Sequence, residues 1–464
     1  MTGGDGLVIS GGGTAVVATD EMLADVESMA AISTGLAAVH SQLAIADATF
    51  SEQSRAVTQV VWARASMDDA WTATTVAKDI SDYLGGQLVV AIDNYTETER
   101  NVEAMALGVD RTLSFAIGAA VGMTPWTGLV GAVIPGLVRD HFANQTDPIG
   151  ARDIDPTAPL FSDESFVEMV RRFVMTGEDF ANGYGGITAQ TAAELKNMGF
   201  TGVALTSQLL ILYAAQAGML QETSVSVAKT ATYERPGPIT STVDRLAAIP
   251  DPALRADGAQ IRIDEIHDGD TVRYEVFIAG TNDFNPISAA EPFDTTSNVA
   301  GVAGGSPASY RAVQLAMEQA GITAESEVSF VGHSQGGLIA SMLAASGDYN
   351  TRGVTSIGGP SGQIIIPPGV PALLIEHYED LVPAFGGTQA NTDALVVRRH
   401  AFSEEYPADT SLPMPAHQLQ YYLQTGALID NAESSVLQDT VDQLNAFSDG
   451  DQVISTWYAA ERVP

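Results

Sequence analysis

One stretch, 328-VSFVGHSQGGLIASMLAA-345, constrains the fold of this 464-residue chain more than any other. It begins with a run of apolar, β-forming residues, turns abruptly at Gly332, and continues through two glycines into a run rich in alanine and leucine. This pattern is typical of a strand that passes through a tight turn into a helix. A single serine, Ser334, lies at the apex of that turn.

Strand and helix patterns alternate on both sides of this stretch. From about residue 260, short β-rich runs such as 274-YEVFI-278 are interspersed with helical patterns such as 307-PASYRAVQLAMEQAG-321. Alternation of this kind is typical of βαβ units on a largely parallel sheet. We therefore expect an α/β domain with a mostly parallel sheet over residues 261–464, with helices at its C-terminal end.

The chain before this region has a different pattern. From about residue 15 to residue 230, apolar residues recur at three- and four-residue spacing, which predicts an all-helical domain. Residues 231–260 are rich in proline, threonine, serine and alanine, and they are typical of a connecting segment with a short helix. We expect residues 1–14 to be a flexible N-terminus.

Composition excludes several classes of function. With 57 Asp and Glu against 21 Lys and Arg, the formal net charge is −36, and such a surface repels the phosphates of nucleic acids. The chain has no cysteine, which excludes disulfides, thiolate nucleophiles and Cys-ligated metals. No pattern indicates a cofactor or metal site. The N-terminus lacks a basic segment followed by an apolar one, so we expect no Sec-type signal peptide.

One apolar segment has two interpretations. Residues 112–138 carry no charge over 27 residues between Arg111 and Arg139, a length that can span a bilayer. Pro125 and Pro135 divide the segment into shorter pieces, which favours a buried helical hairpin instead. A buried hairpin and a membrane contact through residues 112–138 both remain open.

The turn at Ser334 matches the pattern G-x-S-x-G, the only match in the chain. A serine on a tight strand-to-helix turn holds its hydroxyl clear of the backbone, where it can act as a nucleophile. The N–H of Gln335, at the start of the helix, can donate to an oxyanion. A second donor is expected from the loop after an early strand, and the backbone N–H of Thr281 is the candidate.

A nucleophilic serine needs a base, and the base needs an acid that orients it. The strand and loop in 371-PALLIEHYEDLVPAFGG-387 offer three acids, Glu376, Glu379 and Asp380. Asp380 lies past the strand and directly before Leu-Val-Pro, a position suited to a loop carboxylate, so we predict that it is the acid. Glu376 is expected to end the strand, and Glu379 is expected to be solvated.

Four histidines lie in or after the turn, and we predict that His417 is the base. It opens a helix after the proline-containing loop of 411-SLPMPAHQLQYYLQT-425. His400, at the end of a predicted strand, stays open as the alternative. His333 belongs to the turn itself and is expected to point away from the serine hydroxyl, whereas His377 is too near the acid in the chain.

These segments together resemble the α/β-hydrolase superfamily, most closely its lipase and esterase branch, over residues 240–430. The strings VFIAGT, EPFDTTSNV, VGHSQGG, EHYEDLVPAF and PAHQLQYYL occur in the order found in that family. The resemblance implies hydrolysis of carboxylic or lipid esters through an acyl-enzyme, with Ser334, Asp380 and His417 as the triad. The helical N-terminal half departs from typical members of this branch.

Residues 15–105 resemble the WXG-type helical hairpins of type VII (ESX) secretion substrates. Trp62 lies near a break between two helical patterns, and 95-YTETE-99 matches the Y-x-x-x-[D/E] export pattern. Trp62 is followed by Ala-Arg rather than by x-Gly, which departs from the family. The resemblance implies export by a route other than Sec and a small helical secretion partner. A homo-oligomer and a cytoplasmic location remain open as alternatives.

Two functions from different classes therefore remain. The first is a serine hydrolase that cleaves carboxylic or lipid esters, with or without export as an effector. The second is a non-enzymatic secreted or membrane-interacting protein that uses an inactive hydrolase fold as a scaffold. An intact set of serine, acid and histidine favours the first.

Overall fold

The computed structural model divides the chain into two compact units. One comprises residues 15–105 together with Met1, and the other comprises residues 2–14 and 106–464. The structure describes residues 7–11, 30–45, 70–71, 74–75, 78, 164–176, 194–195, 197–198, 200–216, 218–235, 237–285, 287, 289–403, 407–409 and 414–463.

Several predictions lie outside the described residues. These are the assignments made for Trp62, for residues 95–99 and for residues 112–138. The predicted type VII-like export, the secretion partner and the membrane contact depend on them and stay predictions. Among the helices of the described ranges, none is both long and apolar enough to cross a membrane.

The first unit contains two helical stretches in contact. Residues 30–45 are helical, as are residues 70–71, 74–75 and 78. The rings of His40 and Trp71 stack with their centroids 4.5 Å apart, and a hydrogen bond of 3.1 Å joins His40 Nε2 to Thr75 Oγ1. The contacts join side chains that are more than thirty residues apart in the chain.

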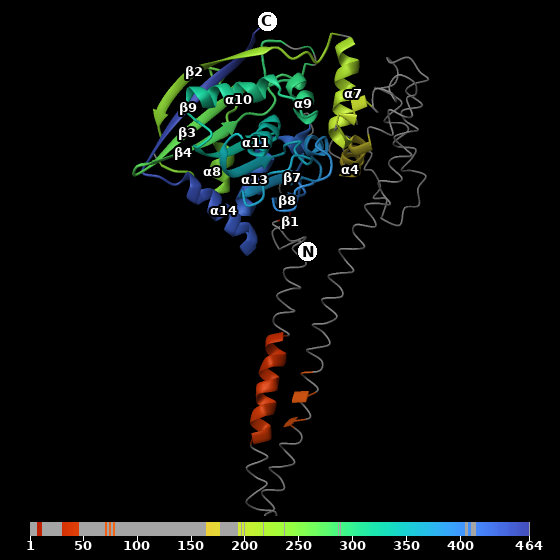
Figure 1. Cartoon of the computed structure of the whole chain (residues 1–464), viewed down its shortest axis with the longest axis vertical. Helices are drawn as coiled ribbons and strands as arrows, with labels where there is room; N and C mark the ends of the chain where they lie inside the picture. Colours follow the sequence, from red (N-terminus) through yellow and green to blue (C-terminus); the bar gives the residue numbers. More distant parts are fainter. Residues whose placement is uncertain are drawn as a thin grey trace, which may run out of the picture. The chain divides into compact units, whose positions relative to one another are not determined.

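The second unit is built on a mixed sheet. Its nine described strands have the order β1-β8-β7-β6-β5-β4-β3-β9-β2 (Figure 1). The strands β4 to β8 run parallel to one another, and β1, β2, β3 and β9 are antiparallel to their neighbours. Strand bounds are β1 Val8–Gly11, β2 Ser224–Glu234, β3 Ile261–Asp268, β4 Thr271–Ile278, β5 Glu327–His333, β6 Asn350–Ile357, β7 Ala372–His377, β8 Leu395–Arg399 and β9 Gln452–Val463. The predicted α/β class with a parallel core is confirmed.

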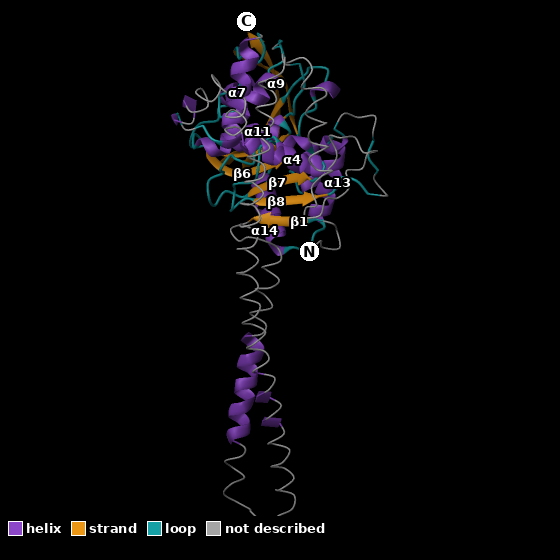
Figure 2. Cartoon of the chain, turned by 90° about the vertical axis from the view of Figure 1, so that its right-hand side faces the viewer, coloured by secondary structure: helices purple, strands orange, loops and turns teal. Residues whose placement is uncertain are grey.

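Helices lie on both faces of the sheet (Figure 2). The α-helices are α4 Glu164–Phe173, α7 Gly202–Gln216, α8 Thr242–Ala247, α9 Thr295–Val302, α10 Ala308–Gln319, α11 Gln335–Ser346, α12 Leu381–Ala384, α13 Leu419–Asp430 and α14 Ser435–Ser448. Short 3-10 helices cover η3 Val174–Thr176, η4 Pro252–Leu254 and η5 Pro415–His417.

The two faces of the sheet differ in chemistry, because side chains alternate along a strand. On one face Val276, Phe330 and Val354 pack against Val313 of α10 and Ile339 of α11 in an apolar core. Burial of this apolar surface stabilises the unit.

The opposite face carries buried ionic groups. Arg245 of α8 donates from Nε to Oε1 of Glu275 on β4 at 3.1 Å. Ser448, at the end of α14, donates to the other oxygen of that carboxylate at 2.8 Å. Both charges are thus paired and hydrogen-bonded, as buried charges require.

Three predictions about segments outside the parallel core of the sheet need correction. Residues 8–11, expected to be flexible, form β1 and pair with β8. Residues 224–234, expected to end the helical domain and to begin the connecting segment, form β2 at the edge of the sheet. The C-terminus, expected to be helical, continues past α14 into β9, which lies between β3 and β2. All three pairings join segments far apart in the chain, which local patterns do not reveal.

The domain boundary also differs from the expected one at residues 231–260. Helix α4, from the predicted helical domain, packs Val167 against Leu381 and Ala384 of α12. Arg171 of α4 donates to the carbonyl of Gly387 at 3.1 Å. Helices α4 and α7 therefore belong to the same compact unit as the sheet.

Candidate catalytic site

The strand β5 ends at His333 and the helix α11 begins at Gln335, so Ser334 alone makes the turn between them. Its backbone has φ 57° and ψ −122°, a conformation that side-chain-bearing residues rarely adopt. Strain of this kind persists only where the surrounding structure holds it, and it is common at functional sites.

Two glycines make this turn sterically feasible. A Cβ atom at Gly332 would lie 2.1 Å from the carbonyl carbon of Gly336. A Cβ atom at Gly336 would lie 2.1 Å from the main-chain oxygen of Ile278 on β4. Any side chain at either position would push the turn away from the sheet, which explains the glycines on both sides of Ser334.

The structure brings Ser334, His417 and Asp380 together. A hydrogen bond of 2.8 Å joins His417 Nε2 to Ser334 Oγ, and one of 2.7 Å joins His417 Nδ1 to Asp380 Oδ2. Ser334, His417 and Asp380 are 5%, 6% and 1% exposed. Asp380 follows β7, and His417 ends the short helix η5 that precedes α13.

The protonation of His417 follows from its two partners. The ionised carboxylate of Asp380 can only accept a hydrogen bond, so Nδ1 of a neutral His417 carries the proton. Nε2 then has a free lone pair and accepts the hydrogen bond from the Ser334 hydroxyl. This is the arrangement in which a histidine can take a proton from a serine.

Several donors hold Asp380 in its charged form. Its Oδ1 accepts from the backbone N–H of Val382 at 2.9 Å, and its Oδ2 accepts from the hydroxyl of Tyr422 at 2.7 Å. Burial acts to raise the pKa of Asp380, but the neighbouring His417 and the hydrogen bonds from His417, Tyr422 and Val382 outweigh it. The pKa of Asp380 is therefore lowered from its usual value.

Two further histidines hold the turn that carries His417. His333 Nε2 donates to the carbonyl of His417 at 2.9 Å, and the two rings stack at 4.8 Å. His377 Nδ1 donates to the carbonyl of Ala416 at 2.8 Å. Burial, with the neighbouring His417, lowers the pKa of His333 to about 3, and burial lowers the pKa of His377 to about 4. Both rings are therefore neutral near pH 7.

The other candidates from the sequence lie elsewhere. His400 is exposed and contacts Glu379, with 2.9 Å between Nδ1 and Oε1. Glu379 also accepts from the backbone N–H of Ala401, so it is not simply solvated as predicted. Glu376 precedes the last residue of β7 and pairs with Arg398 at 3.0 Å.

The loop after β4 passes directly beside Ser334. A Cβ atom at Gly280 would lie 3.2 Å from the Cβ of Ser334, which places Thr281 next to the turn. The hydroxyl of Thr281 accepts from Asn298 Nδ2 at 2.8 Å. Gln335 is the first residue of α11, where backbone N–H groups have no partner within the helix. The two predicted oxyanion donors thus lie on opposite sides of the serine in the chain but close to it in space.

Sequence patterns missed several residues of the site. Tyr422 follows His417 by five residues on the next helix, and its ring stacks on His377 at the end of β7, which brings its hydroxyl to Asp380. Asn298 lies one turn into α9 and contacts Thr281. The interactions of His333 and His377 with the His417 turn were also unforeseen. The string HQLQYYL carried the only local signal, a tyrosine close to the predicted base.

Among the described residues, no group of three or more His, Asp or Glu side chains is placed to hold a metal ion. We compared the chain with protein-family models, with curated proteins and with solved structures, and none of them matches it. The chemistry that the site can support therefore follows from its own geometry.

Proposed function

We propose that this protein is a serine hydrolase of the α/β-hydrolase type that cleaves carboxylic esters through an acyl-enzyme. The observation that carries the proposal is the buried series Asp380–His417–Ser334, with 2.7 and 2.8 Å between the bonded atoms. The strained turn that presents Ser334 at the start of α11 supports the same proposal.

The first half of the reaction forms the acyl-enzyme. Ser334 Oγ attacks the carbonyl carbon of the ester while its proton passes to His417 Nε2. The resulting imidazolium is stabilised by the carboxylate of Asp380. The oxyanion accepts hydrogen bonds from the backbone N–H groups of Gln335 and Thr281. When the ester C–O bond breaks, His417 gives its proton to the leaving alkoxide, which departs as the alcohol.

The second half releases the acid. Water attacks the acyl carbon and gives one proton to His417 Nε2, and the bond to Ser334 Oγ breaks as His417 returns that proton to the serine. The products are one carboxylic acid and the free enzyme.

Labelling with a fluorophosphonate and hydrolysis of a short p-nitrophenyl ester test this proposal. The full chain should react with the probe and hydrolyse the ester, and Ser334→Ala should do neither. Ser226→Ala, at an exposed serine of β2, is the matched control and should behave as the wild type. A wild-type chain that neither labels nor hydrolyses any ester would favour the alternative, a non-enzymatic scaffold.

A further inference from the structure

Arg462, near the end of β9, makes a buried ion pair with Asp294, the residue that caps α9. Arg462 donates from Nε to Oδ2 of Asp294 at 3.0 Å and from Nη2 to Oδ1 at 2.9 Å. Both residues are buried. A guanidinium that donates to both oxygens of a carboxylate fixes the orientation of that carboxylate as well as its position.

Other contacts hold the Arg462 side chain in this place. Its Nη1 donates to Glu222 Oε2 at 3.1 Å, and its Nη2 also donates to Ser297 Oγ at 3.0 Å. The backbone N–H of Arg462 donates to the carbonyl of Ala290 at 2.7 Å. The end of β9 is thus joined to the segment around the start of α9 by its main chain and by its side chain.

Asp294 is joined in turn to the first candidate oxyanion donor. Its carboxylate caps α9 by accepting from the backbone N–H of Ser297 at 2.8 Å. Its main-chain carbonyl accepts from Nε2 of Gln335 at 3.0 Å. Gln335, whose backbone N–H is the candidate donor, is therefore tied by its side chain to the residue that Arg462 holds.

The loop that carries the second candidate donor, Thr281, is joined to the same segment. The backbone N–H groups of Asn282 and Asp283 both donate to the carbonyl of Phe293, at 2.7 and 3.1 Å. Asn298, one turn into α9, donates to the Thr281 hydroxyl at 2.8 Å. The start of α9 and the residue before its cap therefore hold this loop at two points.

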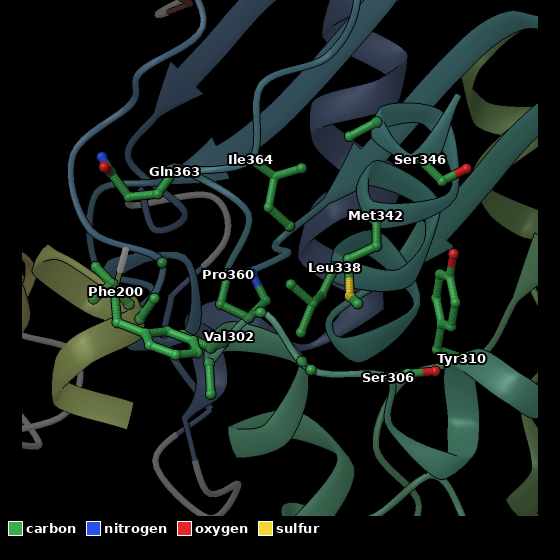
Figure 3. Close-up of a pocket in the computed structure, with 18 of the residues that line it drawn as sticks. Phe200, Val302, Ser306, Tyr310, Leu338, Met342, Ser346, Pro360, Gln363 and Ile364 are labelled. Carbon is green, nitrogen blue, oxygen red and sulfur yellow. The ribbon is translucent and has the colours of Figure 1, made fainter. Parts of the chain in front are cut away.

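The remainder of α9 has limited packing of its own. Of its eight residues, Thr296, Ser297 and Gly301 are buried. Its C-terminal end borders a cavity of about 610 Å³, which Val302 lines (Figure 3). Atoms that face a cavity lack packing partners on that side. The contacts at the N-terminal end of α9 are therefore important for its position.

We propose that Arg462 is a positioning residue for the oxyanion site of this hydrolase. By holding Asp294, it keeps the Thr281 loop and the Gln335 side chain at one fixed point, so that both backbone N–H groups are in place when the ester carbonyl becomes an oxyanion. The proposal rests on the proposed function. Donors that are fixed in advance need no reorganisation at the moment of reaction, which is the advantage of such a rigid attachment.

Loss of the ion pair should slow the reaction without weakening substrate binding. Arg462→Met removes the guanidinium, and kcat for a short p-nitrophenyl ester should fall at least about tenfold with KM little changed, because displaced donors stabilise the transition state less. Ser334 converts a trifluoromethyl ketone into a hemiketal with an oxyanion at the same place, so inhibition by a short alkyl trifluoromethyl ketone should weaken by a similar factor. Gln335→Met keeps the backbone N–H, removes the link to Asp294 and should lower kcat as well.

A double variant covers the case in which Arg462→Met does not fold. Asp294→Asn combined with Arg462→Met removes both charges, so no unpaired charge stays buried at this contact, and asparagine still caps a helix. It should lose no more kcat than Arg462→Met, since both changes break one contact. Arg245→Met is the matched control, because it breaks another buried pair, with Glu275 at 3.1 Å. It should lower the unfolding temperature and leave the kcat of the folded fraction unchanged.

Hydrogen exchange tests the attachment independently of activity. In Arg462→Met protein, the N–H groups of Asn282 and Asp283 should exchange at least about tenfold faster relative to those of the core strand β5 than in the wild type, because the loop opens more readily. In Arg245→Met protein this ratio should stay at the wild-type value. If the wild-type chain neither labels with a fluorophosphonate nor hydrolyses any ester, faster exchange in Arg462→Met would support the attachment while the hydrolase proposal falls.

Two results would overturn the proposal. One is a wild-type kcat in folded Arg462→Met and in the double variant. The other is unchanged exchange at Asn282 and Asp283 in the same two proteins, even where their unfolding temperature falls, which would give Arg462 a role in stability alone. A wild-type kcat in Gln335→Met would overturn the part of the proposal that concerns the Gln335 side chain.

Discussion

His333 donates from Nε2 to the main-chain carbonyl of His417 at 2.9 Å, so the residue that precedes the candidate nucleophile holds the backbone of the candidate base. His377 donates to the preceding carbonyl, that of Ala416. The turn that these histidines hold begins at Met414, whose φ of 48° is unusual for a side-chain-bearing residue. Two neutral rings thus fix a strained turn, and with it the position of His417.

Replacement of His333 tests this positioning role. His333→Leu removes the donor to the His417 carbonyl, and we expect a loss in kcat of at least about tenfold, the cost of a misplaced catalytic group, with KM little changed. His333→Gln keeps an N–H donor at a similar distance and should recover part of the loss. Steady-state kinetics and the rate of fluorophosphonate labelling measure the effect.

A role in stability alone would give a different result. His333→Leu would then unfold at lower temperature, yet the folded fraction would turn over and label at the wild-type rate. That outcome would show that His417 keeps its place without the bond from His333.

The lowered pKa values of His333 and His377 predict loss of stability in acid. Both rings stay neutral in the folded state down to about pH 3 and about pH 4, whereas in the unfolded chain they take up protons below pH 6.5. The unfolded state therefore binds more protons in this range, and the free energy of unfolding falls as the pH falls from about 6.5 towards 4. We expect roughly 1.4 kcal/mol per pH unit for each histidine.

Urea denaturation at a series of pH values measures this slope. His333→Gln removes one of the two groups and should reduce the slope between pH 6 and pH 4 by about half. An identical slope in the variant would show that His333 does not contribute to the acid sensitivity.

The parts of this site that could be predicted from the sequence are those that depend on neighbours in the chain. The turn at Ser334 is encoded locally by two glycines between an apolar strand and an apolar helix. Asp380 and His417 follow from the order of loops after parallel strands, because the carboxyl ends of such strands meet at one edge of the sheet.

The remainder depends on packing between distant segments. Residues 8–11 form a four-residue strand whose partner, β8, lies nearly four hundred residues later. The hydroxyl of Tyr422 reaches Asp380 only through the packing of α13, and Arg171 reaches Glu376 on β7 from a helix two hundred residues earlier. No local periodicity records such contacts.

Replacement of the three joined residues tests whether they act as a unit. His417→Ala and Asp380→Asn should each lower kcat by about a thousandfold or more, and the double variant should lose little beyond the larger single effect. Short-ester kinetics on the full chain measures this. His400→Ala is the matched control, because its exposed ring pairs with Glu379 rather than with the site. Loss of activity in His400→Ala, with His417→Ala near wild type, would assign the base to His400.

The bond from Tyr422 to Asp380 leads to a prediction about stability. Tyr422→Phe removes the hydroxyl that donates to Asp380 Oδ2 at 2.7 Å and keeps the ring, which stacks on His377 at 3.9 Å. A hydrogen bond to a buried charge contributes about 1.5–3 kcal/mol, and we expect the free energy of unfolding at pH 7 to fall by that amount. Urea denaturation measures it.

Tyr421→Phe is the matched control for this change. Its hydroxyl donates to the carbonyl of Pro407 at 3.0 Å and accepts from the backbone N–H of Asp409 at 3.0 Å. Its removal therefore breaks two hydrogen bonds between neutral groups, each of which contributes about 0.5–1.5 kcal/mol. The effect of Tyr422→Phe should also depend on pH. The lowered pKa of Asp380 contributes stability that is present above the carboxyl's unfolded pKa and is lost as the pH falls through its folded value. The cost of Tyr422→Phe should therefore fall in acid, whereas the cost of Tyr421→Phe should stay constant. A cost of Tyr422→Phe that does not change with pH would show that the Tyr422 hydroxyl does not stabilise the charged carboxylate.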